Sequence, residues 1–135
     1  PEISLLIITS RRTSEIIKKI IKLRLGEMAN IWTGEGINPY KFSLKFSSNF
    51  ILTSDSTSMI SESAISGKPI YVYNLPYKRV SKRFESFHNE FKKLNITRNF
   101  EENIVLSNWA YIPLYESKRI AGILNKRIIE EINES

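Results

Sequence analysis

Apolar and polar positions alternate along the chain in a way that predicts strands and helices in turn. Residues 3–9 form a run rich in β-branched residues and leucine, which is typical of a strand buried on both faces of a parallel sheet. Residues 13–25 follow with apolar side chains at helical spacing, namely Ile16, Ile17, Ile20 and Ile21. Gly26 comes next as a stop signal. The chain therefore opens with a strand, a turn and a crossover helix.

The same alternation continues along the rest of the chain. Short strand-like runs occupy residues 29–33, 50–53 and 69–73. Helices are predicted from Tyr40 onward, within residues 55–66, and around Phe84, Phe87, Phe91 and Leu94. After an irregular stretch, a long final helix is predicted from Ile120, Ile123, Leu124, Ile128 and Ile132. Strands that alternate with helices predict an α/β fold, a Rossmann-like parallel sheet with helices on both faces.

Length and composition narrow the class of protein. A chain of 135 residues suits a single domain, and it contains no apolar stretch of the ~20 residues that a membrane helix needs. The absence of cysteine and the single histidine, His88, argue against disulfides and metal sites, so we expect no metal and no cofactor. We expect a cytoplasmic location, with a membrane periphery as the alternative. Because Pro1 leads directly into a strand, we interpret the chain as a fragment cut just before that strand.

The basic residues favour an anionic partner without naming it. Twenty Lys and Arg against fourteen Asp and Glu give a formal charge of +6. They are scattered, and three groups of four stand out, which are Lys18, Lys19, Lys22 and Arg24; Lys78, Arg79, Lys82 and Arg83; and Lys118, Arg119, Lys126 and Arg127. Aromatic side chains are not interleaved with these charges, so solvated helix faces explain them better than a nucleic-acid site. We expect no nucleic-acid partner.

Ligands of such sheets bind beyond the carboxyl ends of the strands, where helix starts present N–H groups. The first segment of this kind is Ser10, Arg11, Arg12 and Thr13, between the first strand and the first helix. Ser10 or Thr13 is a candidate helix cap, while the arginines are suited to bind phosphate through planar, fork-shaped donors. Capping with solvated arginines explains the pattern equally well, so both interpretations stay open.

The second segment is richer in small polar side chains at a helix start, with Asp55, Ser56, Thr57, Ser58, Ser61 and Glu62. Small hydroxyl residues let a ligand approach the backbone closely, and Glu62, one turn in, is placed to accept two sugar hydroxyls. The alternative is that Asp55 or Ser56 caps the helix and Glu62 offsets the helix dipole. That alternative explains Asp55 well, but it explains the clustered hydroxyl residues less well.

Other conspicuous residues have ordinary interpretations beside the functional ones. Trp32 and Asn38 are candidates for a base pocket, although core packing explains Trp32 equally well. His88 is interpreted as a surface or boundary histidine and not as a general base. Trp109 and Tyr111 are expected to pack the start of the last helix against the sheet, with a stacking platform as the lesser alternative. We assign no catalytic residue.

Several of these segments together resemble a known family. They are Ser10-Arg11-Arg12-Thr13, Trp32-Thr33-Gly34 with Asn38-Pro39-Tyr40, the whole of residues 55–69, Arg98-Asn99-Phe100, and Trp109 to Leu114 followed by Glu116. The segment Ser-Glu-Ser-Ala-Ile-Ser-Gly-Lys-Pro resembles the nucleotide-sugar loop of the glycosyltransferase-B superfold. More closely, the chain resembles the carboxy-terminal half of the mitochondrial-fission ELM family, members of which are sometimes labelled nucleoside-diphosphate-sugar epimerases.

The resemblance implies a two-domain protein in which this half binds a nucleotide sugar or nucleoside diphosphate. Glu62 would grip the ribose, and the missing amino-terminal half would supply the acceptor side, so the fragment alone is expected to transfer nothing. The enzyme class that the resemblance implies is glycosyltransferase-like. An epimerase is a third possibility, for which no Tyr-x-x-x-Lys pair is present. Residues 10–13 replace the glycine-rich first loop of many glycosyltransferases. The alternative is a non-catalytic adaptor that binds a protein partner or a membrane surface.

Overall fold

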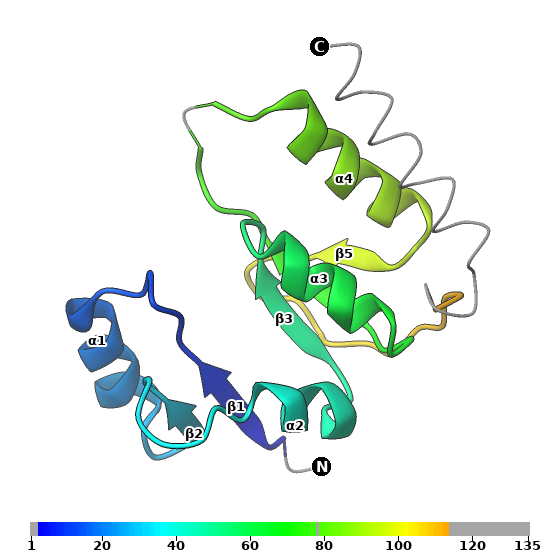
Figure 1. The fold of residues 1–135 in the computed structure, drawn as a ribbon. Helices are drawn as coiled ribbons and strands as arrows, with labels where there is room; N and C mark the ends of the chain where they lie inside the picture. The colour runs from blue at the N-terminus through cyan, green and yellow to red at the C-terminus, as the bar shows by residue number, and fades with distance from the viewer. Residues whose placement is uncertain (1–2, 78, 114–135) are drawn as a thin grey trace. The chain divides into compact units, whose positions relative to one another are not determined.

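The computed structural model describes residues 3–77 and 79–113, which fall into two compact units. Unit 1 comprises Pro1–Ser47, and unit 2 comprises Ser48–Ser135. Both units are built from parallel strands joined by helices (Figure 1). The α/β class predicted from the sequence is therefore confirmed.

Unit 1 is a strand–helix–strand–helix segment. Strand β1 (Leu5–Ile8) is followed by helix α1 (Glu15–Leu25), strand β2 (Ala29–Trp32) and helix α2 (Tyr40–Phe46). The two strands are parallel, with Leu5 opposite Ala29 and Ile8 opposite Trp32. Just beyond this pairing, the N–H and hydroxyl groups of Thr9 both donate to the carbonyl of Trp32, over 3.1 and 3.0 Å. This pair of bonds ties the carboxyl ends of β1 and β2 together.

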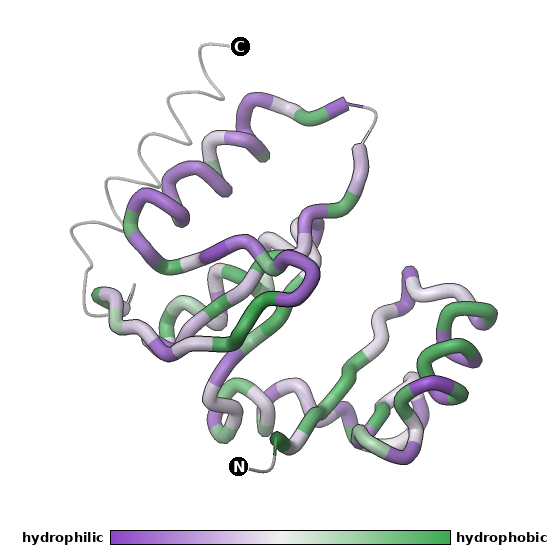
Figure 2. The backbone as a smooth tube through the Cα atoms, turned by 180° about the vertical axis from the view of Figure 1, so that it is seen from behind, coloured by the Kyte–Doolittle hydropathy of each residue, from purple (hydrophilic) through white to green (hydrophobic). Residues whose placement is uncertain are grey.

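Unit 1 buries few of its side chains. Every residue of β1 is only half-buried, and α1 has no buried residue. Ile16 and Leu23 on α1 keep 72% and 87% of their surface exposed. Figure 2 shows β1 and much of α1 as hydrophobic. Many apolar side chains of unit 1 therefore stay partly or largely exposed. The expectation of a first strand buried on both faces was wrong in this respect.

Unit 2 contains a three-stranded parallel sheet and two helices. The elements are β3 (Phe50–Thr53), α3 (Thr57–Ala64), β4 (Ile70–Tyr73), α4 (Lys82–Lys93) and β5 (Thr97–Asn99). Strand β4 is central, because it pairs with β3 on one side and with β5 on the other. Helix α3 packs against β3 and β4, while α4 packs against β5. Figure 1 shows both helices with their strands.

The hydrophobic core of the described residues lies in unit 2. Its buried apolar side chains are Phe50, Ile60, Ala64, Ile70, Tyr71, Val72, Phe91 and Ile96. They come from β3, α3, β4, α4 and the turn that precedes β5. Completely burying a side chain such as Ile60 or Ile70 contributes about 1.5–3 kcal/mol. Unit 2 is thus the better-packed part of the chain.

Residues 101–113 cover one face of the unit 2 sheet, and we call them the covering segment. Tyr71 and Arg98 lie opposite each other in register, so their side chains share that face. The Tyr71 hydroxyl accepts a hydrogen bond from the Ser107 N–H over 2.8 Å, and the Trp109 ring lies edge-on to Tyr71. The Trp109 indole N–H also donates to the carbonyl of Asn95 over 2.7 Å. These contacts anchor a segment that has no regular secondary structure.

A second anchor of the covering segment lies at the loop between α3 and β4. The Tyr111 hydroxyl donates to the Lys68 carbonyl over 2.5 Å, and burial raises the pKa of Tyr111 to about 12. Gly67 has a φ of 74°, and a Cβ there would lie 2.9 Å from Cγ of Pro113. Gly67 was predicted to stop the preceding helix, and its lack of a side chain also leaves room for Pro113.

Element boundaries follow the sequence pattern with a few differences. Strand β3 has the predicted bounds, while β1 is three residues shorter than the predicted run of residues 3–9. Strand β5 lies in the stretch that was predicted to be irregular, and its Thr-Arg-Asn sequence carries no apolar alternation. The predicted final helix, with Lys118, Arg119, Lys126 and Arg127, lies outside the described residues, as do Lys78 and Glu116.

Candidate functional site

The first predicted loop, residues 10–13, is a closed turn in unit 1. The Thr13 N–H donates to the Ser10 carbonyl, and the Ser10 N–H donates to Oγ1 of Thr13, each over 3.1 Å. The Arg12 N–H donates to Oγ of Ser10, also over 3.1 Å. The two hydroxyl side chains therefore hold the turn together, while the side chains of Arg11 and Arg12 are exposed.

The expected capping role of Ser10 or Thr13 was wrong. Helix α1 begins at Glu15, and its cap is Ser14, whose Oγ accepts a hydrogen bond from the Ile17 N–H. Ser14 separates the turn of residues 10–13 from the helix, so the turn closes before the helix starts. Ser10 and Thr13 thus shape the backbone that carries the arginines, and Ser14 satisfies the helix start.

Trp32 lies at the carboxyl end of β2, next to the start of this turn. Its carbonyl accepts the two bonds from Thr9, and its indole Nε1 is buried without a hydrogen-bond partner among the described residues. Asn38, the other candidate for a base pocket, accepts a hydrogen bond from the Tyr40 N–H through its side-chain oxygen. Asn38 therefore supports the start of α2.

The second predicted segment begins α3 in unit 2. Thr57, Ser58, Ser61 and Glu62 belong to α3, which Asp55 and Ser56 precede. Ser56 occupies the capping position, yet its side chain makes no capping hydrogen bond, and its Oγ lies 3.2 Å from Oγ1 of Thr53 instead. By contrast, α1 and α4 each begin with a serine that caps, Ser14 and Ser81. The capping explanation thus fails for Ser56.

The carboxylates of this segment differ in exposure. Glu62 is exposed on α3, whereas Asp55 is half-buried, with a side-chain oxygen shielded from solvent. Ser58 is exposed, and Thr57 and Ser61 are half-buried. The exposed side chains and the first turn of α3 lie at the carboxyl end of β3, which is the edge at which parallel sheets bind ligands.

Ser54 anchors the start of this segment, although it was not predicted to be a site residue. It is 1% exposed, and its N–H donates to the Tyr73 carbonyl over 3.0 Å. Its Oγ accepts a hydrogen bond from the Leu75 N–H over 3.0 Å and lies 3.1 Å from the Tyr77 hydroxyl. In the sequence, Ser54 is only a serine at the end of a strand, and such serines are too common to identify a functional residue.

His88 is buried, so the prediction of a surface or boundary histidine was wrong. It is 6% exposed on α4, with its Nε2 2.9 Å from the Ser54 carbonyl. Phe84 and Phe87 lie edge-on to its ring, at centroid distances of 4.5 and 5.2 Å. Burial lowers the pKa of His88 below its ordinary value of 6.5; the hydrogen bond to Ser54 opposes this effect and nearby Lys92 adds to it.

Trp109 is engaged in packing and does not offer an open stacking platform. The Arg98 guanidinium carbon lies 4.0 Å from the centre of the Trp109 ring, and the Tyr71 ring meets it edge-on at 5.2 Å. Cation–π stacking of this kind occupies one face of the indole. The predicted packing of Trp109 against the sheet is confirmed, whereas the start of the last helix lies outside the described residues.

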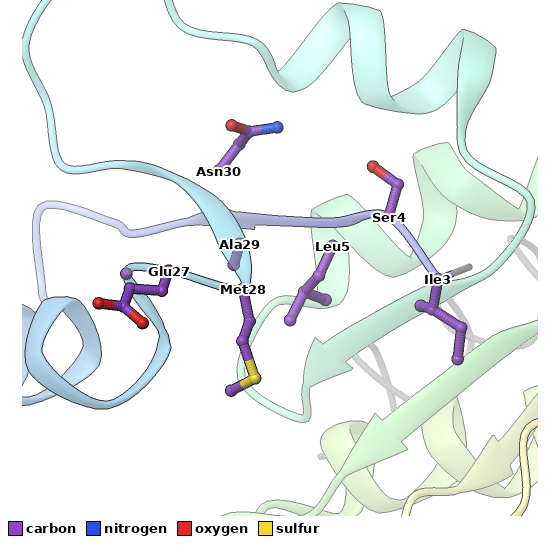
Figure 3. A pocket seen from close by; sticks show the side chains of 8 residues that line it. Ile3, Ser4, Leu5, Glu27, Met28, Ala29 and Asn30 are labelled. Carbon is purple, nitrogen blue, oxygen red and sulfur yellow. The ribbon is translucent and has the colours of Figure 1, made fainter.

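A pocket of about 480 Å³ lies in unit 1 at the amino ends of β1 and β2. Figure 3 shows Ile3, Leu5, Met28 and Ala29 pointing to one side of the two strands and Ser4 and Asn30 to the other. Glu27 is the one ionisable side chain of its lining, and Gly26 completes it. The pocket is at the strand end opposite residues 10–13, and it brings together none of the predicted site residues.

Residues 3–77 and 79–113 contain neither a candidate metal cluster nor a candidate membrane-spanning helix. These residues contain no group of three or more His, Cys, Asp or Glu side chains placed to hold a metal ion. No helix among them has both the length and the apolar character needed to cross a membrane.

Comparison with known proteins assigns the family. The family model described as Mitochondrial fission ELM1 matches residues 1–128. The chain belongs to the mitochondrial fission ELM1 family. This agrees with the resemblance inferred from residues 55–69 and the other matching segments.

Two relatives of this ELM1-family chain are informative. An uncharacterized protein of Rickettsia prowazekii, RP120, is 36% identical over 131 residues, which cover 93% of this chain and 36% of that protein. The mitochondrial fission protein ELM1 of Arabidopsis thaliana is 28% identical over 128 residues, covering 93% of this chain and 30% of that protein. The ELM1-family chain thus spans about a third of the length of these relatives. No solved structure matches it.

Proposed function

We propose that this ELM1-family chain binds a nucleoside diphosphate, the leaving group of a nucleotide sugar, at the start of α3. The observation that carries the proposal is the missing side-chain cap at Ser56, in contrast to the serine caps of α1 and α4. The first N–H groups of a helix have no partner within the helix, and the helix dipole makes them attractive to an anion. A diphosphate supplies the acceptors that the Ser56 side chain does not.

The side chains around this helix start support the same ligand. Ser56, Thr57 and Ser58 are small, so phosphate oxygens can approach the backbone N–H groups closely. Glu62 is exposed one turn further on, where its carboxylate can accept hydrogen bonds from the two ribose hydroxyls. The formal charge of +6 favours the approach of an anion. Together these features suit a nucleotide better than inorganic phosphate.

The arginines of residues 10–13, in unit 1, are a separate candidate for binding phosphate. Ser10 and Thr13 close the turn through three hydrogen bonds, so Arg11 and Arg12 project from a backbone of defined shape. A guanidinium makes two parallel bonds to phosphate oxygens. In a glycosyltransferase-like reaction, such groups would stabilise the negative charge that develops on the departing diphosphate.

A non-catalytic adaptor is the second candidate, because α1 has no buried residue and exposes Ile16, Ile20 and Leu23. Lys19 and Lys22 of the same helix are also exposed. A helix that combines exposed apolar and basic residues suits a protein partner or an anionic membrane surface. The Arabidopsis relative is named as a mitochondrial fission protein, which is compatible with such a role.

Thermal unfolding in the presence of nucleotides distinguishes the two candidates. A ligand at a hundred times its dissociation constant adds ~2.7 kcal/mol to the free energy of unfolding. We expect UDP, GDP or ADP to raise the melting temperature, and the matching nucleoside to raise it less. An adaptor would show no response to any nucleotide, and it would bind anionic vesicles in a salt-dependent way.

A further inference from the structure

Ser54, which follows β3 at the carboxyl end of the unit 2 sheet, makes hydrogen bonds through its backbone and its side chain. Its N–H donates to the Tyr73 carbonyl, and its Oγ accepts from the Leu75 N–H. The same Oγ is paired with the Tyr77 hydroxyl, and its carbonyl is paired with Nε2 of His88. All three polar groups of one buried residue are thus fixed by partners from β4, the loop after it, and α4.

The pairing with His88 defines the protonation of the imidazole. A carbonyl oxygen only accepts hydrogen bonds, so Nε2 of His88 must carry the hydrogen that it donates to Ser54. Nδ1 is buried and has no hydrogen-bond partner among the described residues. A second proton on Nδ1 would therefore be both buried and unsatisfied, and Lys92 would repel the resulting charge. The imidazole is held in its neutral form with the hydrogen on Nε2.

Aromatic packing holds this imidazole in one orientation. Phe84 and Phe87 meet its ring edge-on, and Phe84 in turn meets the Tyr77 ring edge-on at 5.2 Å. Tyr77 then returns to Ser54 through its hydroxyl. The ring contacts and hydrogen bonds form a closed circuit through Ser54, Tyr77, Phe84 and His88, in which the position of each member limits that of the next.

Ser54 is the residue through which this circuit reaches α3. Only Asp55 and Ser56 separate Ser54 from the first residue of α3, and the Ser56 N–H bonds back to the Thr53 carbonyl. We propose that His88 is a positioning residue, which holds the Ser54 carbonyl and thereby fixes where the first turn of α3 presents its N–H groups. This inference deepens the proposed function and rests on it for the identity of the ligand, a nucleoside diphosphate.

Two substitutions of similar size separate the hydrogen bond from the packing. The side-chain amide nitrogen of glutamine lies about where Nε2 of histidine lies, so His88→Gln can still donate to Ser54. The amide of asparagine is one methylene shorter, so His88→Asn cannot reach the carbonyl. Phe91→Leu is the matched control, because Phe91 is buried on the same helix at 4% exposure and lies in the ring stack with Phe87.

The first test needs no ligand. Nitrogen-15 NMR of the single histidine should show hydrogen on Nε2 and none on Nδ1 at neutral pH, and a different tautomer would overturn the inference. Hydrogen exchange should then accelerate about fivefold or more at the Leu75 and Ser56 amides in His88→Asn, since a net hydrogen bond is lost. In His88→Gln and Phe91→Leu, the exchange rates of these two amides relative to those of the other amides of the sheet should be unchanged.

The second test adds UDP, GDP and ADP. Affinity should fall about two- to tenfold in His88→Asn and recover in His88→Gln, while Phe91→Leu keeps the wild-type affinity. If the wild type binds no diphosphate, the proposed function fails, whereas the tautomer and exchange results still decide whether His88 holds the start of α3. Wild-type protection of Ser56 and Leu75 in folded His88→Asn, or equal affinity in all variants, would overturn the positioning role.

Discussion

The single histidine makes the stability of unit 2 sensitive to pH. Burial, with a smaller contribution from Lys92, depresses the pKa of His88 in the folded chain below 6.5, while the hydrogen bond to Ser54 partly offsets this. Between the folded and unfolded pKa values, the unfolded chain binds a proton that the folded chain does not. The contribution to stability is therefore complete above about pH 6.5 and is lost as the pH falls below it.

This linkage predicts a difference between the wild type and His88→Gln. Urea unfolding at pH 7.5 and pH 5.5 should show the wild type losing more stability than the variant over that range, because glutamine does not titrate. Carboxylates titrate in both proteins alike and cancel in the comparison. An identical loss in both proteins would mean that His88 titrates normally in the folded chain.

Glu62 allows a second prediction at the scale of one residue. Glu62→Gln should weaken binding of a nucleoside diphosphate about tenfold or more, because two charge-assisted bonds to ribose become weaker. Its melting temperature should stay nearly unchanged, since the side chain is exposed. Glu85→Gln, an equal change of charge at an exposed position of α4, is the control and should bind like the wild type. Calorimetric titration measures all three; equal affinities would remove Glu62 from the site.

At the scale of the helix, serines that look alike in the sequence have different roles. Ser81 caps α4 by accepting a hydrogen bond from the Phe84 N–H over 3.1 Å, while Ser56 makes no such bond. Ser81→Ala should therefore lower the free energy of unfolding by ~1 kcal/mol, and Ser56→Ala should lower it much less. If Ser56→Ala is as destabilising as Ser81→Ala in urea unfolding, Ser56 is an ordinary cap.

The turn of residues 10–13 gives a further prediction. Replacing Arg11 and Arg12 by alanine should weaken diphosphate binding about ten- to a hundredfold, with lysine giving only partial recovery because it lacks the planar fork. Binding of the nucleoside without phosphates should hardly change. Arg24→Ala, at an exposed position of α1, is the control. Calorimetric titration measures the affinity of each variant for the diphosphate and for the nucleoside. If the variant with both Arg11→Ala and Arg12→Ala keeps the wild-type diphosphate affinity, the turn has no phosphate-binding role.

Local patterns predicted most elements but not the side-chain partners at their ends. The apolar runs located β1 to β4, and the spacing of phenylalanines located α4, because burial of one face dictates both patterns. Strand β5 was missed because its three residues are polar, and each of them pairs with a residue of β4 that lies 27 positions earlier in the sequence. The cap of α1 was misplaced because Ser10, Thr13 and Ser14 are chemically similar, and only backbone geometry distinguishes them.

In the candidate site, too, the sequence predicted the residues that follow a local pattern and not those that depend on distant contacts. The segment with Ser56 and Glu62 was located from the sequence, because a helix start rich in hydroxyl residues is a local pattern. Ser54, Tyr77 and His88 were not, because their contacts join residues 23 and 34 positions apart. Their burial comes from tertiary packing, which no spacing rule in one sequence reveals.

At the scale of the whole molecule, the two units differ in how far they bury their apolar residues. Unit 2 contains the buried core, whereas α1 of unit 1 leaves Ile16 and Leu23 largely exposed. The chain spans about a third of its relatives in the ELM1 family. Binding of a nucleoside diphosphate by residues 55–62 can therefore be measured on this chain alone. The proposed transfer of a sugar has to be measured on the longer proteins.

The most direct measurement is a nitrogen-15 amide titration of the chain with UDP, GDP and ADP. We predict that one of these ligands shifts the amides of Thr57, Ser58 and Met59 most strongly, because these N–H groups form the first turn of α3. The nucleoside alone should shift them far less. Shifts confined to the amides of the exposed lysines of α1 and α4, or no saturable shift with any diphosphate, would show that the start of α3 is not a diphosphate site.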